Sequence, residues 1–158
     1  MNYIAQFGHL HIVKWARENG CDWDEQTFSG AAKSGNLKLL RWLYEQDCPR
    51  SVKWTSWAAA KSGHLHIIRW LKDHGFGFDE KTCAAAAESG NLNLLQWLRE
   101  QGCTWDFETT WAAARCSCFD IMLWARQNGC PWDEHACWGA GEFIHLTLDH
   151  VDKYTSAN

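Results

Sequence analysis

The chain has 158 residues, with 15 Lys and Arg against 19 Asp and Glu and no basic run. This balance argues against a DNA- or RNA-binding protein, because contacts with the phosphate backbone need clustered Lys and Arg. No apolar run approaches the roughly 20 residues of a membrane span, and the first ten residues do not resemble a signal peptide. We therefore expect an intracellular protein, cytoplasmic or nuclear, that binds neither nucleic acid nor membrane.

A sequence block recurs at a spacing of 27 or 28 residues: Ala-Ala-x-Ser-Gly-x-Leu-x-Leu-Leu-x-Trp-Leu, followed by Gly-Cys-x-Trp-Asp-Glu. Self-similarity at this period marks stacked units, each of which cannot bury its apolar face alone. Residues 1–158 are therefore predicted as one repeat array. It has a partial first unit at 1–23, four units at about 24–50, 51–78, 79–105 and 106–132, and a degenerate last unit at 133–158.

Each unit carries two predicted helices, and the first opens with an acidic N-cap residue, as at Asp24 and Asp79. Asp accepts hydrogen bonds from the free amides of a first turn. The helix then runs through a pair of Ala residues, whose small side chains should let neighbouring units approach closely. It ends before a Gly position, where a left-handed residue caps the helix, and Ser117 replaces Gly in the fifth copy.

The second helix of each unit has apolar residues at helical spacing, such as Leu37, Leu40 and Trp42. It closes at a second Gly position, for which Asp47 is the substitute. Its recurring Trp, which we call the Trp ladder, is expected to pack in the core rather than to stack on bases or aromatic ligands. The ladder is Trp15, Trp42, Trp70, Trp97 and Trp124. The links between units are too short for a two-stranded ribbon, so the predicted fold is all-α.

Four of the eight Cys residues occupy one position just after the second helix, at Cys21, Cys48, Cys103 and Cys130. Neighbouring helices pack about 8–10 Å apart, whereas a disulfide needs Cα atoms within about 7 Å. We therefore expect this Cys ladder to consist of reduced, small, buried residues.

Two further clusters have some resemblance to metal sites: Cys116-x-Cys118, and Cys130-x4-His135-x-Cys137. Neither has the two Cys pairs at the spacing of a zinc site. The pairs His9/His11 and His64/His66 are interpreted as helix starts, because Asn replaces the first His in other units. We expect no metal and no other cofactor.

The units carry a family resemblance. The run Thr82-x-x-x-Ala86-Ala87-Glu88-Ser89-Gly90-Asn91-Leu92 resembles the ankyrin repeat, whose core is Ala-Ala-x-x-Gly-His before a Val/Leu-rich second helix. The unit is shorter than the usual repeat of about 33 residues. Together with its Trp and Cys residues, this makes it similar to the short ankyrin arrays of oomycetes, algae and large DNA viruses. The resemblance implies a right-handed, ankyrin-like helix-turn-helix solenoid, with short links in place of β-hairpin fingers.

The resemblance also implies protein–protein recognition, with no catalytic residues, through a concave groove lined by the first helices. Two rows of residues, three positions apart on those helices, share a face. The small row is Gly30, Ala58, Ala85, Ala112 and Gly139; the charged row is Lys33, Lys61, Glu88, Arg115 and Glu142. A plain solvated face is the alternative interpretation of the charged row. Trp57, Trp111 and Trp138 share another position, where either partner contact or packing between units would account for them.

No phosphate-binding loop, nucleophile elbow or Ser/His/Asp set is recognisable, so we do not expect an enzyme. We expect a monomeric interaction scaffold that binds a protein partner through the concave face of the first helices. The predicted partner-binding residues are Lys33, Trp57, Lys61, Glu88, Trp111, Arg115 and Glu142. Two alternatives remain: a metal- or redox-responsive module, and the targeting arm of a larger enzyme or ubiquitin-ligase-type adaptor.

Overall fold

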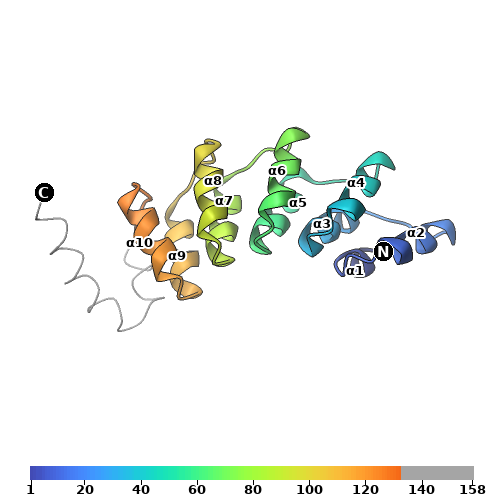
Figure 1. Cartoon of the computed structure of the whole chain (residues 1–158), viewed down its shortest axis with the longest axis horizontal. Helices are drawn as coiled ribbons and strands as arrows, with labels where there is room; N and C mark the ends of the chain where they lie inside the picture. Colours follow the sequence, from blue (N-terminus) through green and yellow to red (C-terminus); the bar gives the residue numbers. More distant parts are fainter. Residues whose placement is uncertain (133–158) are drawn as a thin grey trace, which may run out of the picture.

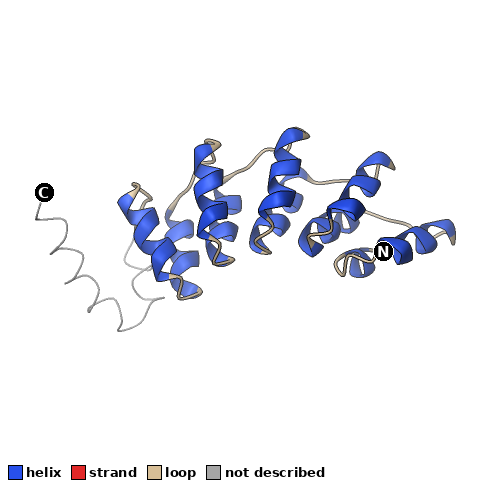
Figure 2. Cartoon of the chain, in the orientation of Figure 1, coloured by secondary structure: helices blue, strands red, loops and turns tan. Residues whose placement is uncertain are grey.

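A computed structural model describes residues 1–132, and the predicted last unit at 133–158 lies outside the described residues. Within the described part the chain forms helices and no strands (Figure 2), which confirms the all-α prediction. None of these helices is long and apolar enough to cross a membrane. The helices are α1 (Asn2–Ala5), α2 (Leu10–Glu18), α3 (Glu25–Ser34), α4 (Leu37–Glu45), α5 (Val52–Lys61), α6 (Leu65–Asp73), α7 (Glu80–Glu88), α8 (Leu92–Glu100), α9 (Phe107–Arg115) and α10 (Phe119–Gln127).

Consecutive helices form pairs that follow one another along the long axis of the molecule (Figure 1). We call α1, α3, α5, α7 and α9 the first helices, and their partners α2, α4, α6, α8 and α10 the second helices. The closest backbone contacts between successive pairs join the first helices in order. The predicted Ala pairs lie at these contacts and are buried, as Ala31, Ala59, Ala86 and Ala113 illustrate. Small side chains therefore allow the close approach, as expected.

Side chains fix where the first helices begin. The Asp24 carboxylate accepts the backbone N–H of Thr27 at 3.0 Å, and the Thr27 hydroxyl accepts the N–H of Asp24, which completes a capping box. Asp79 and Thr82 repeat this arrangement at α7. Each box satisfies amides that a first turn leaves free. At α5 the equivalent residue, Ser51, makes no such bond, so the unit at 51–78 lacks this cap.

The left-handed positions lie where the repeat predicts them. Gly35, Gly63 and Gly90 follow the first helices with φ between 72° and 73°. Ser117, in the same position after α9, has φ 56°, and Asp47, after α4, has φ 52°. These two residues adopt a conformation that costs an L residue with a side chain more than it costs Gly.

The second helices α4, α6 and α8 are tied to the preceding pair by their N-cap residues. The Asn36 side chain accepts the amide of Leu39 at 3.0 Å and donates to the carbonyl of Gly8 at 2.6 Å. Asn91 makes the equivalent two bonds, to Leu94 and Gly63. His64 replaces Asn in the third pair and reaches a different acceptor, because its Nε2 lies 3.0 Å from the carbonyl oxygen of Lys33.

The core lies between the two helices of each pair and holds fully buried aliphatic residues of the second helices, such as Leu40, Ile68 and Leu95. The prediction that the whole Trp ladder is buried is wrong. Trp70 is 7 % exposed, but Trp15 is 63 % exposed, and Trp42, Trp97 and Trp124 are half-buried at the edge of the core. The aliphatic positions of the same helix face the core directly, which leaves the Trp rings at its margin.

Aromatic residues of the links explain the place of the half-buried Trp rings. Trp23 contacts Trp42 edge-to-face at 5.8 Å, and Trp105 contacts Trp124 in the same way at 5.6 Å. The link before α5 has no Trp, and Tyr44 of α4 takes its place by contacting Trp70 edge-to-face at 5.3 Å. Offset or edge-to-face aromatic pairs of this kind stabilise beyond their buried area.

The Cys ladder is buried at three of its four positions. The Sγ atoms of Cys48, Cys103 and Cys130 lie 3.8, 3.2 and 3.3 Å from the carbonyl oxygens of Asp24, Asp79 and Asp106, the N-cap residues of the preceding first helices. In each case the acceptor lies 24 residues before the Cys. The expectation of burial is wrong for Cys21, which is exposed.

Candidate functional site

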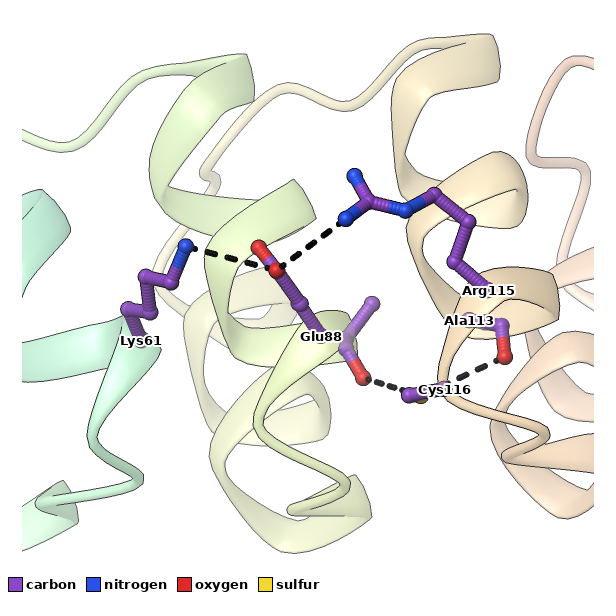
Figure 3. Close-up of polar contacts among 6 residues, drawn as sticks. Lys61, Glu88, Ala113, Arg115 and Cys116 are labelled. Atoms are coloured by element: carbon purple, nitrogen blue, oxygen red, sulfur yellow. Dashed lines mark hydrogen bonds and ion pairs between the residues drawn. The ribbon is translucent and has the colours of Figure 1, made fainter.

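The charged row predicted from the sequence forms a connected set on the first helices. Glu88 on α7 lies between Lys61 on α5 and Arg115 on α9 (Figure 3). Its Oε1 is 3.3 Å from Lys61 Nζ and 3.8 Å from an Arg115 guanidinium nitrogen. Lys33 on α3 donates from Nζ to Gln6 Oε1 at 3.3 Å. The row is thus partly satisfied within the chain, and exposed ion pairs of this kind contribute little to stability.

Trp57 and Trp111 lie beside this row, each under a cation of its own helix. Lys61 Nζ is 4.9 Å from the ring centre of Trp57, and Arg115 Cζ is 4.6 Å from that of Trp111. These residues are four positions apart, which places them on one helix face. Trp57 is half-buried and Trp111 is 39 % exposed. The two Trp residues and the charged row therefore form one continuous surface.

Trp54 belongs to the same surface and was missed by the sequence analysis. It is 63 % exposed and meets Trp57 edge-to-face at 5.8 Å. Its place three residues before Trp57 on α5 puts it on the same face, which the sequence could have indicated. Gln26, Lys81 and Glu108 occupy this position on α3, α7 and α9, so the repeat does not preserve an aromatic residue there.

Two hollows open on this surface, and α5 separates them. The α3 hollow has a volume of about 590 Å³ and is lined among others by Tyr3, Ser29, Gly30, Lys33, Trp54 and Trp57. The α7 hollow has a volume of about 510 Å³ and is lined among others by Trp54, Trp57, Ala84, Ala85, Trp111 and Arg115. Because Trp54 and Trp57 line both, the two hollows form one groove over the first helices, which we call the first-helix groove.

The hollows follow from an alternation of large and small residues at one helix position. Trp57 and Trp111 occupy it on α5 and α9, whereas Ser29 and Ala84 occupy it on α3 and α7. Each small residue therefore lies at the bottom of a hollow whose walls are aromatic. The equivalent Trp138 lies outside the described residues, as does Glu142 of the charged row.

The small row was predicted to share the surface of the charged row, and its described members do line the groove, although they are largely covered. Gly30 and Ala58 line the α3 hollow, and Ala85 and Ala112 line the α7 hollow. Ala58, Ala85 and Ala112 are 7 %, 2 % and 5 % exposed, because they face the neighbouring first helix. Only Gly30 is half-buried, in the α3 hollow. Gly139 of this row lies outside the described residues.

The Cys and His side chains that resemble metal ligands in sequence form a disulfide or contact backbone carbonyl oxygens. Cys116 and Cys118 form a disulfide in the turn between α9 and α10, a bond that the sequence analysis did not predict. His64 and His66 contact the carbonyl oxygens of Lys33 and Gly35 at 3.0 and 2.9 Å. Within residues 1–132, no three His, Cys, Asp or Glu side chains gather in a way that could hold a metal ion. His135 and Cys137 lie outside that range.

Comparison with known proteins assigns neither a family nor a function to this chain. The chain matches no protein-family model, and no curated protein matches it significantly. The groove and its residues are therefore the basis for a functional proposal.

Proposed function

We propose that this chain is a non-catalytic interaction module whose first-helix groove binds a protein partner. The observation that carries the proposal is the pair of hollows of about 590 and 510 Å³, separated by Trp54 and Trp57. Trp and Arg are enriched at the anchor positions of protein interfaces. The module would act as a monomer inside the cell, with Lys33, Lys61, Glu88 and Arg115 at the edge of the interface.

We further propose that the helix pairs form an ankyrin-like solenoid, with the groove on its concave side. The repeat in sequence, the short links and the row of pairs support this. Successive pairs make their closest backbone contacts through the Ala-rich first helices, whereas the second helices carry bulky Leu and Trp residues. Each helix pair is therefore narrower at its first helix than at its second, and stacking such pairs curves the array toward the first helices. Such a surface loses little entropy when a partner docks, because it is already ordered.

The test fills the groove without disturbing the fold. Ala84→Trp places a large ring in the α7 hollow, and α5 and α9 already carry Trp at the same helix position. Asn93→Trp adds the same ring at an exposed position on the second helix α8 and is the matched control. Each variant and the wild type would serve as bait in affinity capture from the source cell, after circular dichroism has shown equal helix content.

We expect at least one protein to be captured by the wild type and by Asn93→Trp and to be lost with Ala84→Trp. Equal capture by all three baits would place the binding surface elsewhere. Charge reversal at Lys61 and Arg115 is a less clean test, because both side chains pair with Glu88 and reversal would bring three carboxylates together.

A further inference from the structure

The turn between α9 and α10 carries two Cys residues where the preceding turns carry hydrogen-bonding side chains. The first position holds Ser34, Ser62 and Ser89 in the α3–α4, α5–α6 and α7–α8 turns, and the second holds Asn36, His64 and Asn91. In the α7–α8 turn, Ser89 and Asn91 donate to backbone carbonyl oxygens at 2.7 and 3.0 Å. Cys116 and Cys118 replace both residues in the next turn and form a disulfide with each other.

The backbone of this turn has the form of turns that contain no Cys. The N–H groups of Ser117 and Cys118 donate to two carbonyl groups of α9 at 3.0 and 2.9 Å. The N–H groups of Gly63 and His64 donate to the equivalent carbonyl groups of α5 at 2.9 and 3.1 Å. The turn therefore forms without a sulfur–sulfur bond. It holds the Cα atoms of Cys116 and Cys118 5.3 Å apart, within the distance that a disulfide needs.

The reduced form of the pair fits the same turn. Cys116 Sγ lies 3.3 Å from the carbonyl oxygen of Ala113 and 3.4 Å from that of Ala87 (Figure 3). A disulfide sulfur has no proton to donate, whereas a thiol is a weak donor and can use these acceptors. Cys118 Sγ faces Gly90, which has no side chain to cover it. Two thiols can thus occupy the turn without rearranging it.

The disulfide contributes little as a structural cross-link. It joins residues only two positions apart, and the chain entropy that a disulfide removes decreases with the length of the loop. Within residues 1–132 the other Cys residues are free thiols, as in proteins of a reducing compartment, where the disulfides that do form are mostly transient. Cys116 and Cys118 are only half-buried, and Ser117 between them is exposed, so a small thiol can reach the bond.

We propose that Cys116 and Cys118 form a redox-active site that exchanges between disulfide and dithiol with low-molecular-weight thiols of the glutathione class. This inference does not depend on the proposed function of the groove. In reduction, the thiolate of one small molecule attacks a sulfur of the pair, forms a mixed disulfide and releases the other sulfur, which takes up a proton.

The second step completes the exchange. A second thiolate attacks the small-molecule sulfur of the mixed disulfide, and the remaining Cys leaves and is protonated. Two electrons pass from two small thiols to the Cys pair, and the small molecules leave as their own disulfide. Oxidation of the pair by that small disulfide is the reverse reaction.

The test is an equilibrium titration of the full chain in oxygen-free glutathione buffers. After acid quenching and alkylation with N-ethylmaleimide, trypsin releases residues 116–126 as one peptide, whose mass distinguishes disulfide, dithiol and mixed disulfide. The control parameter is the ratio of the squared concentration of reduced glutathione to that of oxidised glutathione. Over about a hundredfold range of this ratio, the peptide from the native chain should change from about 90 % disulfide to about 90 % dithiol, as a two-electron couple requires.

The same titration in urea measures what the fold contributes. The unfolded chain does not hold the two Cα atoms together, so its midpoint should lie at a ratio about tenfold lower. Because the fold favours the disulfide, the disulfide also favours the fold, and the wild type should melt at a higher temperature in oxidised than in reduced glutathione. Cys116→Ser with Cys118→Asn, the residues of the α7–α8 turn, is the matched control and should melt at one temperature in both.

Three results would overturn the redox-active site. The peptide could remain disulfide, or remain dithiol, at every ratio, or accumulate only as mixed disulfide. The native and urea-unfolded chains could have the same midpoint, which would mean that the fold does not build the site. The double variant could show the same shift in melting temperature as the wild type, which would assign the effect to other Cys residues.

Discussion

Within residues 1–132, two non-glycine residues hold left-handed backbone conformations at positions where other units have Gly. Ser117 has φ 56°, and Asp47 has φ 52°. Ser117→Gly should raise the free energy of unfolding by about 0.5–1 kcal/mol, because it relieves the Cβ clash of that conformation. Asp47→Gly should gain less, since Asp tolerates this region better.

The control for this prediction is Ser62→Gly. Ser62 directly follows α5 and has φ −90°, so Gly there relieves no strain and only loosens the unfolded chain. Urea denaturation of the three variants would measure the differences. A loss of stability with Ser117→Gly would contradict the account of the left-handed position.

His64 makes stability depend on pH. Burial lowers its pKa below the ordinary value, and the hydrogen bond to the Lys33 carbonyl only partly offsets this. The unfolded chain therefore takes up the proton more readily. The free energy of unfolding should therefore carry no penalty from His64 above about pH 6.5. It should fall as the pH drops from there through the lowered pKa of His64 in the folded state.

The variant that tests this is His64→Asn, since Asn occupies the same position at Asn36 and Asn91. We expect it to flatten the dependence of the free energy of unfolding on pH between pH 7 and 5. His9→Asn, at the equivalent exposed position of the first pair, should leave the slope unchanged. An unaltered slope with His64→Asn would show that another group is responsible.

At the scale of the element, the Trp residues of the ladder occupy equivalent positions on the second helices but differ in how far they are buried. Trp70→Ala should cost about 3–5 kcal/mol, as for a large buried aromatic residue, because it removes contacts with Tyr44 and with the stacked ring of His74. Trp15→Ala removes a side chain that is 63 % exposed and should stay within about 0.5 kcal/mol of wild type. Equal losses in thermal or urea unfolding would contradict this assignment.

The links between helix pairs should shield their thiols. Burial, together with the carboxylate of Asp24 or Asp106, raises the pKa of Cys48 and of Cys130 to about 11. At pH 8 both are protonated, and the thiolate is the reactive form. Iodoacetamide should therefore modify the exposed Cys21 first and reach Cys48 and Cys130 only in urea, as peptide mass mapping would show. Modification of Cys48 as fast as Cys21 in the native protein would refute the shielded position.

At the scale of the whole molecule, what the sequence predicted correctly is local and repeated. The helix ends at Asp24 and Gly35 and the close contact at Ala31 depend on neighbours within one unit, and several copies of the unit give the same signal. Contacts that cross between units in only one place could not be predicted. The repeat gives no sign that Tyr44 replaces a missing link Trp or that Glu88 joins two cations.

The candidate groove was predicted in part for the same reason. The i and i+3 spacing placed the small row and the charged row on one face, and the α7 hollow is lined by members of both rows: Ala85, Glu88, Ala112 and Arg115. Spacing alone did not show how far the small row is covered, and Ala58, Ala85 and Ala112 are at most 7 % exposed. Trp54 was missed because it occurs at its position on α5 alone among α3, α5, α7 and α9.

The central claim, that the first-helix groove is where a protein partner binds, is tested most directly by photo-cross-linking in the source cell. A photoreactive amino acid replaces Ala84, in the α7 hollow, or Asn93, on the exposed side of α8. The account predicts a discrete protein adduct from position 84 and none of the same size from position 93. Adducts from position 93 alone, or the same adduct from both positions, would contradict it.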